Sequence, residues 1–165
     1  METKPKNFDQ DMSLEIKFSR TIKAILGQQF IGKSIEADLK EGTDFLVFQV
    51  SPFRIAVRLR RYKYFLNPKY QHQFTVRWKR PSGVKTEIDK INDGLVDYML
   101  YGFVNASETK IVKYFIADLS VFRNISPEPA EIHTNADKSS QLAAYQISQF
   151  PEEFILKKWE ISPKQ

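Results

Sequence analysis

The chain has 165 residues, of which 42% are hydrophobic and 27% charged, and its formal net charge is +5. This composition is too apolar for a wholly disordered protein, and the length suits a single domain, residues 1–165, with its own core. The absence of cysteine excludes disulfide bonds, thiolate zinc sites and a cysteine nucleophile. Because no apolar run is long enough to span a membrane and the N-terminus lacks the apolar segment of a signal peptide, we expect a cytoplasmic protein.

The N-terminal part of the chain predicts a helix and then a strand. Residues 1–10 are polar, and we expect them to be flexible. The next apolar residues recur with the period of one helix face: Leu14, Phe18, Ile22 and Ile25. Gly27 is the predicted end of this helix. Residues 44–50 are nearly continuous in apolar side chains, which predicts a strand covered on both faces.

Two further strands are predicted by alternation with a period of two. In residues 54–60 and 73–79, apolar side chains at every second position alternate mainly with arginine and lysine. We therefore expect two neighbouring strands that each bury one face and present basic residues on the other.

A short helix and a hairpin are predicted next. Thr86 and Asp89 have the spacing of a capping box, and Gly94 ends the helix. Residues 97–104 and 110–119 are rich in aromatic and apolar side chains, and the segment between them is polar. This pattern predicts two strands joined by a loop.

The C-terminal part of the chain gives weaker signals. Residues 124–139 predict a loop, because Pro127 and Pro129 disfavour regular structure. Residues 141–159 suit either a strand or a helix. All the elements together predict an α/β protein of α+β character, in which helices flank a mixed central sheet of at least five strands.

Between Asp44 and Glu87 the chain carries no acidic residue. These 42 positions hold ten lysines and arginines and nine aromatic residues. A block of one charge sign interleaved with rings is typical of a surface that binds a polyanion, so the expected partner is nucleic acid, DNA before RNA. We expect the contacts to come from Arg54, Arg60, Arg61, Arg77, Lys79 and Tyr62. Tyr62 is suited to stacking on an unpaired base.

The predicted order of helix, three strands, helix and strand resembles the αβββαβ core of the PD-(D/E)XK nuclease-like superfamily. That superfamily includes many restriction endonucleases, Holliday-junction resolvases and phage nucleases. The resemblance covers about residues 13–104, and residues 105–165 form a C-terminal extension. In the superfamily an acid begins or ends one strand, and Glu-x-Lys or Asp-x-Lys lies on the next. Here Asp44 opens a strand, and Ala56-Val57-Arg58 lies on the next.

This resemblance implies Mg²⁺-dependent hydrolysis of a phosphodiester, with Asp44, Arg58 and Glu87 as the catalytic residues. Asp44 and Glu36 are the implied metal ligands. Arg58 stands at the lysine position, where it can stabilise phosphate charge but cannot easily act as a base. Ala56 replaces the expected acid, so the second carboxylate must come from elsewhere. The candidates are Glu36, Asp38, Glu87 and Asp89.

Three functions fit the sequence. The first is a metal-dependent nuclease, in which Arg58 acts in the chemistry while Arg77 and Lys79 act in binding. The second is a nucleic-acid-binding module without catalysis, which Ala56 favours. The third is a protein-interaction factor with an acidic partner, because arginine, tyrosine and tryptophan are also typical of interface hot spots. The oligomeric state is open, and a homodimer is compatible with all three.

Overall fold

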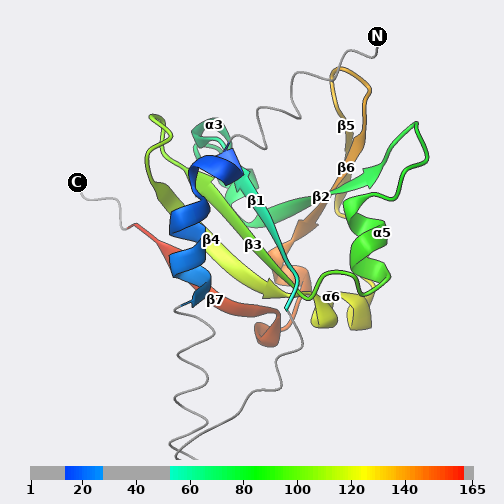
Figure 1. Ribbon diagram of the computed structural model, residues 1–165. Helices are drawn as coiled ribbons and strands as arrows, with labels where there is room; N and C mark the ends of the chain where they lie inside the picture. Colours follow the sequence, from blue (N-terminus) through cyan, green and yellow to red (C-terminus); the bar gives the residue numbers. More distant parts are fainter. Residues whose placement is uncertain (1–13, 28–52, 162–165) are drawn as a thin grey trace, which may run out of the picture. The chain divides into compact units, whose positions relative to one another are not determined.

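The computed structural model describes residues 14–27 and 53–161. Contacts divide the chain into two units, residues 1–52 and 53–165, and each is described by itself. In the first unit residues 14–27 are helical apart from a turn at Phe18, as the apolar stripe predicts (blue in Figure 1). The expected flexible lead and the expected strand 44–50 lie outside the described residues. None of the described helices is long and apolar enough to cross a membrane.

The second unit contains a four-stranded mixed sheet (Figure 1). Its strands, in spatial order, are β1 (Ile55–Arg60), β3 (Tyr98–Val104), β4 (Ile111–Asp118) and β7 (Ile155–Glu160). The strand β1 runs parallel to β3, and the other two pairs are antiparallel. The predicted hairpin is therefore confirmed as β3 and β4. At Gly102 of β3 an added Cβ would lie 2.9 Å from the Lys113 carbonyl oxygen, so only glycine lets the two strands approach this closely.

A second, three-stranded sheet is antiparallel throughout. Its strands, in spatial order, are β2 (Gln73–Lys79), β6 (Gln141–Gln146) and β5 (Glu131–Thr134). The middle strand β6 belongs to the segment for which the sequence left strand and helix open. The remaining C-terminal elements are the 3₁₀ turns η1 (Ile147–Gln149) and η2 (Glu152–Phe154), which lead into β7.

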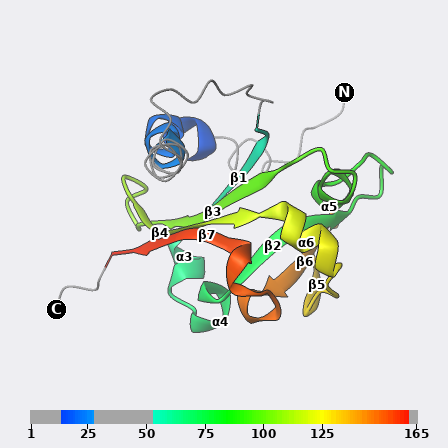
Figure 2. The same cartoon turned by 90° about the horizontal axis from the view of Figure 1, so that it is seen from below.

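Short helices connect the strands. They are α3 (Tyr62–Phe65), α4 (Pro68–Gln71), α5 (Glu87–Asn92) and α6 (Leu119–Ile125). The connection from β1 to the parallel strand β3 holds α3, α4, β2 and α5. Figure 2 shows α3 and α4 on the same side of the four-stranded sheet as β2. The helix α5 begins with the predicted capping box at Thr86, and Gly94 ends it with a φ of 67°.

The core of this unit lies between the two sheets and is rich in aromatic rings. Phe74 of β2 is fully buried at its centre. Its ring centroid lies 5.6 Å from that of Tyr145, 6.3 Å from that of Tyr101 and 5.6 Å from that of Phe154. The apolar face of β2 thus packs against side chains of β3, β6 and η2. This packing determines which way the opposite face of β2, with its polar side chains, points.

The predicted α/β class with a mixed sheet is confirmed, but three details of the prediction are wrong. The described strands form two sheets instead of one sheet of at least five strands. The strands over residues 54–60 and 73–79 are not hydrogen-bonded neighbours, because β1 pairs with β3 and β2 pairs with β6. The predicted loop over residues 124–139 also contains the short strand β5.

Candidate nucleic-acid interface and active site

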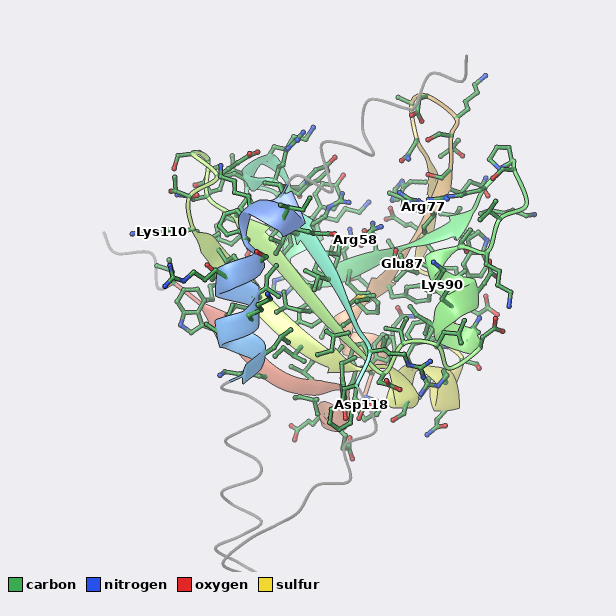
Figure 3. All side chains as sticks on the ribbon, in the orientation of Figure 1. Arg58, Arg77, Glu87, Lys90, Lys110 and Asp118 are labelled. Carbon is green, nitrogen blue, oxygen red and sulfur yellow. The ribbon has the colours of Figure 1, made fainter. Side chains whose placement is uncertain are left out.

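Three predicted site residues meet beside β1, which is the outer strand among the described strands of the four-stranded sheet (Figure 3). Arg58 lies on β1, Arg77 on β2 and Glu87 at the start of α5. Nη2 of Arg58 donates to Oε2 of Glu87 at 2.9 Å, and the backbone N–H of Arg77 donates to the same oxygen at 2.9 Å. We call these three residues the arginine–glutamate cluster. It draws together two strands of different sheets and one helix.

Local sequence signals place Glu87 in this cluster. Asp89 accepts a hydrogen bond from the backbone N–H of Thr86 at 2.7 Å, and this bond fixes the first turn of α5. Glu87 is the first residue of the helix, directly after the buried cap residue Thr86. The backbone and hydroxyl hydrogen bonds from Thr86 hold the pKa of Asp89 below its usual range. Asp89, one of the candidate metal-binding acids, therefore serves as a helix cap.

The ion pair between Arg58 and Glu87 is partly shielded from solvent. The side chains are 15% and 23% exposed, respectively. Arg58 projects from the same face of β1 as Ala56, which packs against the core, and it stands opposite Tyr101 in the β1–β3 register. Both hydrogen bonds to Glu87 use Oε2, so neither uses Oε1. The cluster thus holds a guanidinium and a carboxylate in fixed relative positions beside β1.

Two of the predicted nucleic-acid contacts have structural partners. Arg54 donates from its backbone to Oδ2 of Asp97 at 2.8 Å and from Nη2 to the carbonyl oxygen of Gly94 at 2.7 Å. These hydrogen bonds, the backbone one foremost, hold the pKa of Asp97 below its usual range. Arg61 lies 3.2 Å from the carboxylate of Glu108. Arg54 and Arg61 flank β1 at its two ends, where they tie it to neighbouring loops.

The other predicted contacts surround the cluster in different ways. The guanidinium carbon of Arg60 lies 4.0 Å from the ring centroid of Tyr64, on the same face of β1 as Arg58. Lys79 is exposed at the end of β2. The ring of Tyr62 packs against Phe65, with centroids 5.8 Å apart. Arg60 and Lys79 therefore extend the positive surface of the cluster along two strands.

The described residues alone do not form a magnesium site. No group of three or more acidic or histidine side chains comes together within residues 14–27 and 53–161. Glu87 is the one predicted catalytic acid in that part of the chain. Asp44 and Glu36, the predicted metal ligands, lie outside it, as does Asp38. One carboxylate whose Oε2 already accepts two hydrogen bonds is too few oxygen ligands for Mg²⁺.

Three residues of the site were not predicted from the sequence. Gln73 and Thr75 lie on the same face of β2 as Arg77, and Tyr101 lies across from them on β3. The hydroxyls of Thr75 and Tyr101 are 3.3 Å apart and buried. The period-two alternation over residues 73–79 places Gln73 and Thr75 on the same strand face as Arg77 and Lys79. This pattern could have identified them as candidate site residues.

Comparison of the chain with protein-family models, with curated proteins and with solved structures found no match. What the site can bind or catalyse is therefore inferred from its own residues. They offer a positively charged strand face, a fixed arginine at its centre and a carboxylate beside that arginine.

Proposed function

We propose that the protein is a metal-dependent nuclease that binds nucleic acid across β1 and β2 and hydrolyses a phosphodiester beside Arg58. One observation carries this proposal: Glu87 reaches Arg58, with 2.9 Å between Oε2 and Nη2. A PD-(D/E)XK-like site needs a carboxylate close to the basic residue, and Ala56 cannot supply it. In this proposal Glu87, from the helix after β2, takes the place of the missing acid.

Arg58 acts on the phosphate in this mechanism. A guanidinium binds two phosphate oxygens at once, keeps its charge at all relevant pH values and stabilises negative charge that develops in the transition state. The ion pair with Glu87 limits the motion of Arg58, so the enzyme loses little entropy in positioning it. A guanidinium group stays protonated in proteins, so Arg58 does not act as a base.

Asp44 and Glu36 are the proposed magnesium ligands. Bound Mg²⁺ would supply an activated water and would neutralise phosphate charge. Arg60, Arg77 and Lys79 hold the nucleic-acid backbone on either side of the scissile phosphate and set its register. DNA is the proposed substrate, with RNA as the alternative, and the proposed location is the cytoplasm.

A non-catalytic nucleic-acid-binding module is the second candidate, and Ala56 favours it. Ala56 lies on β1 two residues before Arg58, on the same face, and packs against the core. At this position the chain therefore has an apolar contact where a nuclease of this type has a metal ligand. In such a module Glu87 would serve to orient Arg58 and nothing more.

The test compares cleavage with binding in the same variants. Cleavage of labelled DNA is measured with Mg²⁺, and binding is measured with EDTA, for the wild type and for Asp44→Ala, Glu87→Gln and Arg58→Ala. Glu153→Gln, an exposed glutamate on η2, is the matched control. The nuclease proposal predicts that the first three variants lose cleavage by at least about a hundredfold and keep binding within a few fold, while the control changes neither.

Cleavage that survives Asp44→Ala would contradict the assigned site. Binding without cleavage by the wild type, at any Mg²⁺ concentration, would favour the binding module. A chain that binds no nucleic acid at low salt would contradict both, and an acidic protein partner would then be the better proposal.

A further inference from the structure

A pocket of about 220 Å³ lies next to the arginine–glutamate cluster, between β1 with its following helices and the three-stranded sheet. We call it the inter-sheet pocket, and its principal lining residues are Arg60, Tyr64, Tyr70, Gln73, Thr75 and Tyr101. The volume equals that of about seven waters in the liquid, at about 30 Å³ each. Pockets for drug-sized ligands begin near 300 Å³, so this one suits a single ring system.

Polar groups form the floor of the inter-sheet pocket. Gln73, Thr75 and Tyr101 are 2%, 8% and 3% exposed, respectively. Oε1 of Gln73 accepts from Nε2 of Gln146 at 3.3 Å. Nε2 of Gln73 has no hydrogen-bond partner among the residues that the structure describes. A buried donor without a partner costs about 1–3 kcal/mol, and an acceptor on a bound ligand would satisfy this amide.

Aromatic and apolar groups form the walls. The rings of Tyr64 and Tyr70 pack edge to face with centroids 5.8 Å apart, and Phe103 and Leu142 also line the space. The guanidinium of Arg60 lies over the Tyr64 ring and brings a positive charge to the rim. Aromatic rings together with a few buried polar groups are typical of a site that stacks a planar ring and binds its edge by hydrogen bonds.

The pocket lies within one nucleotide of the proposed scissile phosphate. Thr75 is two residues before Arg77 on the same face of β2, and Tyr101 is opposite Arg58 in the β1–β3 register. Two residues along a strand span about 6.4–6.8 Å, a distance that one nucleotide covers. A nucleic acid whose phosphate lies at Arg58 therefore has an adjacent base within reach of the pocket.

We infer that the inter-sheet pocket binds one unpaired nucleobase of the nucleic-acid substrate. This inference rests on the proposed function and names the substrate class: single-stranded nucleic acid, or a duplex from which one base has been extruded. The base stacks among Tyr64, Tyr70 and Phe103, and an acceptor atom on its edge takes the hydrogen bond from Nε2 of Gln73. A base that stays paired inside a duplex cannot enter a pocket of this size.

The test measures how much one base adds to binding when the phosphates stay the same. Binding to two dye-labelled abasic strands of equal length is measured by fluorescence anisotropy with EDTA. The first strand is abasic except for a single base at its centre, and the measurement is repeated with each of the four bases at this position. The second strand carries no base. The inference predicts that at least one base tightens binding about tenfold in the wild type, as expected for one stacked base.

Two variants locate this effect in the pocket. Gln73→Met and Tyr101→Phe keep the side-chain size and remove a polar group, so the base effect should fall to about threefold or less. Binding of the wholly abasic strand should stay unchanged. Tyr114→Phe is the matched control, because Tyr114 is also a buried tyrosine of the four-stranded sheet but stacks on Trp159 on the opposite face. Thermal unfolding shows that each variant is folded.

Each result has one meaning. Equal binding of the two strands by the wild type would overturn the base pocket and leave the phosphate-binding interface standing. A base effect that persists in both folded variants would also overturn it, because the base would then bind elsewhere. If the wild type binds neither strand, the proposed function fails and the inference fails with it.

Discussion

Replacement of Glu87 by glutamine tests the arginine–glutamate cluster most directly. The amide oxygen can still accept the hydrogen bonds from Arg58 and from the backbone of Arg77, so the main loss is the negative charge. The Arg58 bond loses the attraction between opposite charges but keeps a charged donor, so the change should cost about 1 kcal/mol.

The loss in free energy of unfolding also depends on how far the side chains of Arg58 and Glu87 are exposed to solvent. Exposed ion pairs contribute about 0–1 kcal/mol, and the loss of one partner from a fully buried pair costs about 3–5 kcal/mol. Side chains that are 15% and 23% exposed lie between these limits. We therefore expect Glu87→Gln to lower the free energy of unfolding by about 1–2 kcal/mol. For a chain of this length, that loss lowers the melting temperature by about 2–8 °C.

A double-mutant cycle separates this interaction from other effects. Urea unfolding is measured at neutral pH for the wild type, Glu87→Gln, Arg58→Met and the double variant, with Glu153→Gln as the control. The expected coupling energy between the two positions is about 1 kcal/mol, and the control should stay within about 0.5 kcal/mol of the wild type. A coupling energy below about 0.3 kcal/mol, or a gain in stability in Glu87→Gln, would contradict a stabilising ion pair between Arg58 and Glu87.

Two further predictions concern binding and pH. Arg77→Ala combined with Lys79→Ala should weaken DNA binding and lower the slope of log K against log[salt] by about one to two phosphates, and an unchanged slope would place the DNA elsewhere. The pKa of Asp97 is lowered in the folded state, mainly by the Arg54 backbone N–H, so its stabilising effect is present above about pH 4 and is lost as the pH falls through the folded-state pKa. Asp97→Asn should therefore reduce the acid-induced fall in the free energy of unfolding between pH 5 and pH 2. An equally steep fall in this variant would contradict that assignment.

Local signals in the sequence predicted the positions of most described elements. Thr86, Asp89 and Gly94 located α5 because capping depends on residues within one helical turn. Alternation located β1 and β2 because the faces of a strand are set by its own residues. The strand β5 gave no such signal, since it is short, carries the single apolar residue Ile132 and has mostly exposed side chains.

The pairing of strands could not be predicted in the same way. Alternation tells which face of a strand is buried but not which strand covers it. The predicted neighbours β1 and β2 therefore proved to belong to different sheets. The functional site shows the same limit. Arg58 and Glu87 were predicted as individual residues, whereas the role of Tyr101 depends on its contact with Thr75, which lies 26 positions away.

The connectivity of the two sheets has a consequence for how the protein folds during synthesis. The strand β2 pairs with β6, so the backbone of Gln73 can pair only after Gln146 has been synthesised. In the same way, β4 can pair with β7 only after residues near 160 have left the ribosome. Until then the nascent chain exposes the apolar face of β2, with Phe74 at its centre. Pairings between strands that lie far apart in the sequence slow folding, because the chain must close long loops before these contacts form. Since β2 contributes both Arg77 and lining residues of the inter-sheet pocket, the proposed nucleic-acid interface is complete only after β6 has paired with β2.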